Sequence, residues 1–164
     1  MTFCQTEELF NEAPVGMGQA VCAREPTRLT AILGSCIAVT LYAPRLRLGM
    51  LSHVVLPHAN SSTTYPAKFA DTAIPHMLSV LQEHGVRPSG LIAKIVGGAC
   101  MFGGNGKFMD IGRCNARAAI QALEAADIQV TQRDVAGTVG RRVCFDLATG
   151  GLTVESPGHP SRTI

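Results

Sequence analysis

Cys36 and His53 are residues of types that could support nucleophilic catalysis, and they lie seventeen positions apart. A cysteine nucleophile needs a base that accepts its proton, and imidazole suits that role near neutral pH. The hydroxyl of Thr30 could accept a hydrogen bond from the imidazole and fix its tautomer. The three side chains therefore predict acyl-transfer chemistry on a carbonyl group. By residue type alone, such a pair is more often a buried core thiol and an ordinary histidine.

The sequence around Cys36 is typical of a strand that ends in a tight turn. Residues 29–33 alternate in polarity and predict a strand, which Gly34 and Ser35 bring to an end. Glycine adopts backbone conformations that other residues resist, so Gly34 can expose the next residues at the turn. We expect the backbone amides near Ser35 and Cys36 to face a bound carbonyl oxygen and stabilise the oxyanion.

His53 lies in a second apolar segment, 48–56, that also predicts a strand. The segment 37–42 is rich in β-branched residues, and a short loop at 43–47 separates the two. Pairing of these strands as a hairpin would bring His53 opposite Cys36. The predicted site therefore depends on one hairpin.

The remaining pattern predicts a mixed α+β chain. Helical spacing covers 69–81, and Asn115 could cap a second helix. Further strands are predicted at 19–23, 91–96, 128–134, 142–147 and 152–155. Strands and helices do not alternate strictly, which favours an α+β sandwich over a doubly wound parallel sheet. We expect an irregular lead-in over 1–18, a single domain over 19–155 and a disordered tail over 156–164.

Composition excludes several classes of protein. The 164 residues are 46% hydrophobic, and 14 basic and 12 acidic side chains give a net charge of +2. This balance gives no electrostatic basis for binding nucleic acid or a membrane surface. The N-terminal residues lack the pattern of a secretory signal, and no apolar run approaches the roughly 20 residues that span a bilayer. We therefore expect a cytoplasmic protein whose six cysteines are thiols.

The glycine-rich segment 97–112 and the histidines are the candidates for a cofactor or metal site. Lys107 is followed by Phe108 and not by Ser or Thr, and Met101 stands where a P-loop needs glycine, so nucleotide binding is not predicted. His53 and His58 have no acidic residue between them and form no zinc-binding pattern. The sequence predicts no metal and no cofactor, and the glycine-rich segment is expected to pack beside the cleft.

Six segments of the chain resemble the chemoreceptor glutamine deamidase family, CheD. They occur in the family's order and cover roughly residues 20–155. The segments are TAILGSC with the following IAVTLYAP, GMLSHVVLP at 49–57, AKIVGGACMF at 93–102, IGRCN at 111–115, DVAGTVGRR at 134–142 and the ATGG turn.

The resemblance implies a fold, an activity and a set of residues. The implied fold is a layered α/β/β/α sandwich of mixed sheets, similar to that of cytotoxic necrotizing factor-type cysteine hydrolases. The implied reaction is hydrolysis of a receptor glutamine side chain to glutamate. Position by position, the family pattern implies Cys36 as nucleophile, His53 as base and Thr30 as the orienting hydroxyl.

The resemblance also implies partners. Methyl-accepting chemotaxis receptors would be the substrates, so the protein would lie beside receptor arrays without inserting into the membrane. The same thioester chemistry could cleave a glutamate methyl ester, which would make the protein a receptor methylesterase as well. A non-catalytic alternative is an adaptor that binds a receptor or a chemotaxis phosphatase of the CheC type.

Overall fold

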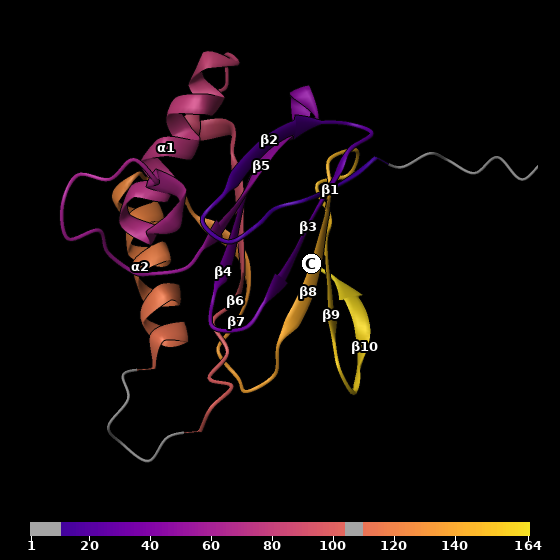
Figure 1. The fold of residues 1–164 in the computed structure, drawn as a ribbon. Coiled ribbons are helices and arrows are strands. Elements are labelled where there is room, and N and C mark those ends of the chain that lie inside the picture. Colours follow the sequence, from indigo (N-terminus) through magenta and orange to yellow (C-terminus); the bar gives the residue numbers. More distant parts are fainter. Residues whose placement is uncertain (1–10, 104–109) are drawn as a thin grey trace, which may run out of the picture.

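The computed structural model describes residues 11–103 and 110–164 as an α+β sandwich. Two five-stranded sheets lie face to face, and two helices pack on one of them (Figure 1). Each sheet contains one parallel pair of strands among antiparallel pairs, so both sheets are mixed. Residues 1–10 of the lead-in predicted for 1–18 and the part of the glycine-rich segment at 104–109 lie outside the described residues.

The sheet that carries the predicted hairpin, sheet B, has the strand order β2-β5-β4-β6-β7. Its strands are β2 (Ala20–Arg24), β4 (Ile37–Ala43), β5 (Leu48–Val54), β6 (Ile92–Gly97) and β7 (Val130–Val135). Strands β4 and β5 pair in antiparallel register, joined by the 3₁₀ turn Pro44–Leu46. The predicted hairpin is therefore confirmed, and its strands lie at the centre of the sheet.

The second sheet, sheet A, has the strand order β1-β3-β8-β9-β10. Its strands are β1 (Glu12–Pro14), β3 (Arg28–Leu33), β8 (Arg141–Asp146), β9 (Leu152–Ser156) and β10 (His159–Thr163). Strand β10 contradicts the prediction of a disordered tail, because it pairs with β9. Strand β1 likewise pairs with β3 inside the segment predicted as an irregular lead-in.

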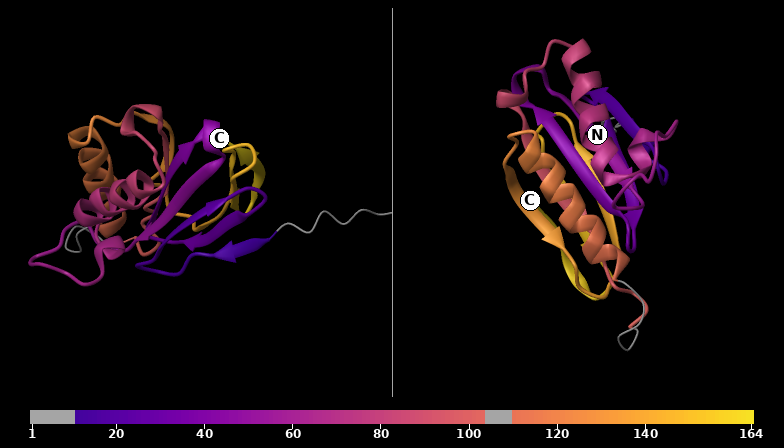
Figure 2. Two further views of the ribbon diagram at one scale, coloured as in Figure 1. Left: turned by 90° about the horizontal axis from the view of Figure 1, so that it is seen from above. Right: turned by 90° about the vertical axis from the view of Figure 1, so that its left-hand side faces the viewer.

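Both helices, α1 (Ala70–Glu83) and α2 (Ile111–Ala125), cover the same face of sheet B (Figure 2). Apolar residues at helical spacing, such as Ala73, Met77 and Leu81, bury one stripe of α1 against that sheet. No helix of the described residues covers the outer face of sheet A. The layers are therefore α/β/β and not the α/β/β/α arrangement that the resemblance implied.

Side chains alternate strictly between the two faces of β4. Ile37, Val39 and Leu41 contribute to the core under the helices, whereas Ala38 and Tyr42 contribute to the core between the sheets. This alternation follows from the two-residue period of a strand. It decides which side of the sheet each predicted site residue faces.

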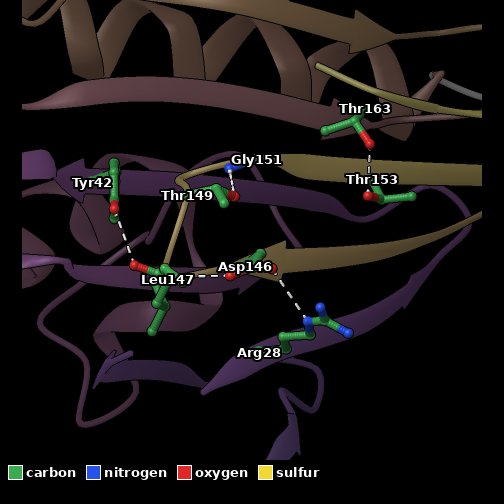
Figure 3. Close-up of polar contacts among 9 residues, drawn as sticks. Arg28, Tyr42, Asp146, Leu147, Thr149, Gly151, Thr153 and Thr163 are labelled. Carbon is green, nitrogen blue, oxygen red and sulfur yellow. Dashed lines mark hydrogen bonds and ion pairs between the residues drawn. The ribbon is translucent and has the colours of Figure 1, made fainter. Parts of the chain in front are cut away.

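Polar contacts between the sheets and within sheet A gather at one end of the sandwich (Figure 3). The buried hydroxyl of Tyr42, on β4 of sheet B, donates to the carbonyl oxygen of Leu147 at 3.0 Å, just beyond β8 of sheet A. Arg28 pairs with Asp146 across β3 and β8, and the hydroxyls of Thr153 and Thr163 lie 2.9 Å apart across β9 and β10. These contacts lie near the end of β4 that is farthest from Cys36.

Candidate active site

Cys36 and His53 lie on the same face of sheet B. His53 on β5 is directly opposite Ala38 on β4, and Cys36 stands two residues before Ala38. Because alternate residues share a face, both side chains point into the layer between the sheets. They are diagonal neighbours, a relation in which α-carbons lie about 7–8 Å apart and long side chains can interact. Both residues are largely buried, at 9% and 3% exposure.

The imidazole of His53 is oriented by the segment between β1 and β2. Its Nδ1 lies 3.0 Å from the carbonyl oxygen of Val15. The backbone of His53 is held by the same segment, because its amide donates to Gln19 and its carbonyl accepts from Gly18. Sequence reasoning missed Val15, since a main-chain carbonyl is common to every residue and gives no sequence signal.

The contact with Val15 decides which ring nitrogen can act as a base. A carbonyl oxygen can only accept, so Nδ1 must carry the proton. In the neutral ring the lone pair is then at Nε2. This Nε2 is buried and has no hydrogen-bond partner among the described residues. Nε2 is therefore the ring nitrogen that can act as a base.

The surroundings of Cys36 favour the thiol over the thiolate. Burial raises its pKa above the ordinary value for a cysteine, because the apolar surroundings disfavour the thiolate. No hydrogen bond joins the thiol to His53 among the described residues. Such contacts commonly tighten only when substrate is bound.

The hydroxyl of Thr30 does not orient His53. On β3 the residues Leu29 and Ala31 face the inter-sheet core, so Thr30 faces the other side, opposite Cys144 of β8. Sequence reasoning could not place this strand in a different sheet from His53. Thr30 reaches the site only through its backbone, because its carbonyl oxygen accepts from the amide of Val15 at 2.8 Å.

Each backbone carbonyl of the turn at Gly34–Cys36 accepts a hydrogen bond. The carbonyl of Gly34 accepts from Ala99 at 2.9 Å, and that of Cys36 accepts from Gly98 at 2.8 Å. The carbonyl of Ser35 accepts from the side chain of Asn115 at 3.0 Å. In contrast, the amides of Ser35 and Cys36 donate to no group of residues 11–103 and 110–164. Backbone amides without partners beside a nucleophile are the donors that an oxyanion hole requires.

The turn is packed against glycines that admit no side chain. A β-carbon on Gly97 would lie 2.3 Å from the carbonyl oxygen of Cys36, and Gly97 has a φ of +119°. A β-carbon on Gly98 would lie 2.6 Å from the carbonyl oxygen of Gly112 in α2. These glycines let β6 and α2 approach the Cys36 turn closely.

We expect Gly97→Ala to lower the free energy of unfolding by about 3 kcal/mol, because overpacking and a left-handed backbone penalty add. Urea denaturation measures the change. Gly90→Ala is the matched control, since nothing lies within 4 Å of a β-carbon there and its φ is not positive. The control should stay within about 0.5 kcal/mol of the parent. Equal effects of the two substitutions would contradict this packing.

Cys36 opens into a cleft of about 780 Å³. The cleft is lined by Gly34, Ser35, Cys36, the segment 99–102, the start of α2 and two residues from other segments, Met17 and Ile32. Its rim is apolar and exposed, since Met17, Ile32, Met101 and Phe102 are between 51% and 91% exposed. Large apolar side chains exposed together at a cleft are typical of a surface that binds another protein.

The described residues include no group of three His, Cys, Asp or Glu side chains that could hold a metal ion. All five cysteines in the described part of the chain are free thiols. Neither of the two described α-helices is long and apolar enough to cross a bilayer.

Comparison with known proteins identifies the family. The family model described as CheD chemotactic sensory transduction matches residues 55–156. A protein from Desulforamulus reducens is 39% identical over 158 residues, which cover 93% of this chain and 95% of the relative. The chain belongs to the CheD family.

Other CheD relatives come from distant organisms. A Clostridium botulinum protein is 37% identical over 160 residues, covering 94% of this chain and 99% of the relative. A Methanococcus vannielii protein is 37% identical over 142 residues, covering 86% and 92%. Each of the three is named "Probable chemoreceptor glutamine deamidase CheD". The segment matched by the CheD model includes Asn115 and begins after His53.

Proposed function

We propose that this CheD protein hydrolyses glutamine side chains of chemoreceptors to glutamate, with Cys36 as nucleophile and His53 as base. Two observations carry the proposal: the thiol of Cys36 lines a cleft beside unpartnered amides, and the imidazole of His53, whose Nε2 has no partner among the described residues, lies on the same face of sheet B. The names of the relatives supply the substrate class.

The first half of the reaction forms a thioester. The thiol of Cys36 transfers its proton to Nε2 of His53 as the sulfur attacks the side-chain carbonyl carbon. The amides of Ser35 and Cys36 donate to the resulting oxyanion. Collapse of this intermediate breaks the carbon–nitrogen bond, and the imidazolium gives its proton to the departing nitrogen, which leaves as ammonia.

The second half releases glutamate. Water transfers a proton to Nε2 of His53 and attacks the thioester carbonyl. The carbon–sulfur bond then breaks, and the sulfur of Cys36 regains a proton. The net reaction is amide plus water to carboxylic acid plus ammonia. Throughout, the carbonyl of Val15 keeps the proton on Nδ1, and Thr30 contributes by holding the amide of Val15.

Val15 stabilises the imidazolium less than a carboxylate would, because a carbonyl carries only a partial charge. A fold similar to that of the cytotoxic necrotizing factor-type cysteine hydrolases is part of this proposal.

A protein-bound glutamine fits the cleft better than the free amino acid. The exposed apolar rim at Met17, Ile32, Met101 and Phe102 offers contacts that free glutamine cannot use. The same rim supports the proposal that a phosphatase of the CheC type binds here as a second partner. Since a thiol nucleophile must stay reduced, we place the activity in the cytoplasm.

The test is incubation of the purified protein with a chemoreceptor cytoplasmic fragment. We expect release of ammonia and a mass increase of about 1 Da at each modified glutamine, and no release from free glutamine at the same concentration. A fragment carrying glutamate methyl esters tests the esterase reaction in parallel, by release of methanol. An unchanged receptor fragment would contradict the deamidase proposal and leave an adaptor.

A further inference from the structure

Asn115 is a buried amide on α2 that the proposed reaction does not use. It is 0% exposed and lies in the second turn of the helix, among small apolar residues that include Ala116 and Ala119. The sequence predicted it as the cap of this helix. The cap is instead Asp110, whose side chain accepts from the amide of Arg113 at 3.1 Å. The position of Asn115 thus needs another explanation.

The side chain of Asn115 joins the Cys36 turn to the strand that carries His53. Its Nδ2 donates to the carbonyl of Ser35 at 3.0 Å and to the carbonyl of Val55 at 2.9 Å. Both partners can only accept, so the amide nitrogen must face them.

The two carbonyls lie where the β4–β5 ladder stops. The last paired residues are Ile37 and Val54, so Ser35 and Val55 lie just beyond the ladder. One amide group with two protons satisfies both carbonyls at the point where the strands separate. The close packing of Gly98 on Gly112 brings α2 near enough for this contact.

The Oδ1 atom of Asn115 is buried and has no hydrogen-bond partner among the described residues. An amide that leaves one polar atom unsatisfied in an apolar layer is unfavourable for folding alone. The two hydrogen bonds that Asn115 donates beside the Cys36 turn offer a functional reason for this cost.

We propose, on the basis of the proposed deamidase function, that Asn115 is a positioning residue that aims the amide of Cys36 at the oxyanion. The Ser35–Cys36 peptide bond is trans, so its carbonyl and its N–H point in opposite directions. By holding the carbonyl of Ser35, Asn115 turns the N–H of Cys36 away from the helix. That N–H has no partner among residues 11–103 and 110–164, and Cys36 lines the cleft.

Two reactions of the same thiol separate this role from a general effect on the fold. Deamidation develops an oxyanion and needs the hole, whereas alkylation by iodoacetamide displaces iodide and develops none. For Asn115→Asp and Asn115→Ala, we expect kcat for ammonia release to fall about 100-fold with KM nearly unchanged, the loss typical of one oxyanion donor. The alkylation rate of Cys36 should stay within about 3-fold of the parent.

Gln121→Glu is the matched control, because it makes the same amide-to-carboxylate change on an exposed position of α2. It should leave both rates at the parent level. Circular dichroism and thermal denaturation establish that each variant is folded. Parallel loss of deamidation and alkylation, or loss of neither, would overturn the role of Asn115.

A measurement on the parent protein covers the case in which neither Asn115 variant folds. In NMR spectra, the side-chain amide protons of Asn115 should exchange with solvent at least 100-fold more slowly than those of Gln121. Fast exchange at Asn115 would show that the two hydrogen bonds do not persist, and would overturn the proposal. A parent protein that releases no ammonia would instead overturn the proposed deamidase function itself.

Discussion

Replacing Cys36 with alanine is expected to lower the rate of ammonia release from a receptor fragment by about 10⁴-fold or more. The substitution removes the only atom that forms the thioester, and loss of a covalent nucleophile has effects of this size or larger in other hydrolases. Steady-state ammonia release measures the change. Binding of the receptor fragment should persist, because the apolar rim of the cleft is untouched.

The matched control is Cys144→Ala, which makes the same substitution on the outer face of sheet A. Its activity should remain within about 3-fold of the parent. Trapping of a thioester on Cys36 by mass spectrometry would add direct support. Ammonia release by Cys36→Ala at the parent rate would mean that another group attacks the amide, and the assignment of the site would fail.

Replacing His53 with asparagine is expected to lower activity about 1000-fold, within the range found for a general acid–base group. Asparagine can still donate to the carbonyl of Val15, so the local packing is kept while the base is lost. His58→Asn is the control, because His58 is exposed and lies outside the cleft. Activity of His53→Asn close to that of the parent would remove His53 from the mechanism.

The residual activity of the His53→Asn variant should depend on pH through ionisation of the Cys36 thiol. Burial raises the pKa of Cys36, so at pH 7 less than a few per cent of the thiol is ionised without a base. Because the thiolate forms only as pH approaches this raised pKa, the residual activity should rise about 10-fold per pH unit through pH 8. The parent should reach its plateau at lower pH, since His53 removes the proton during attack. Superimposable profiles would contradict this account.

The sequence was sufficient to predict the strands and the hairpin that carry Cys36 and His53. Segments 37–42 and 48–56 are apolar, rich in β-forming residues and separated by a short loop, and such local signals determine a hairpin. The predicted register is wrong by two residues, since His53 lies opposite Ala38 and not opposite Cys36. Because side chains alternate along a strand, the register alone brings the thiol and the imidazole to one face.

Other predictions failed because they depended on contacts between distant segments. The alternation along β3 is as regular as expected, but it turns the hydroxyl of Thr30 away from His53, since β3 belongs to the other sheet. The tail at 156–164 has few apolar residues, and it is ordered as β10 because β9 offers a free edge. Helix propensity could not tell that α1 and α2 cover the same face.

The sequence by itself determined the chemistry available to this protein, namely a thiol and an imidazole on one hairpin and a glycine-bearing turn at the nucleophile. Only the tertiary structure decided how these groups are held. The carbonyl of Val15 orients the ring, and the amide of Asn115 fixes the turn, through contacts between residues far apart in the chain. Strand periodicity is a local property that a sequence displays, whereas a backbone carbonyl or a buried amide acquires its partner only when distant elements pack together.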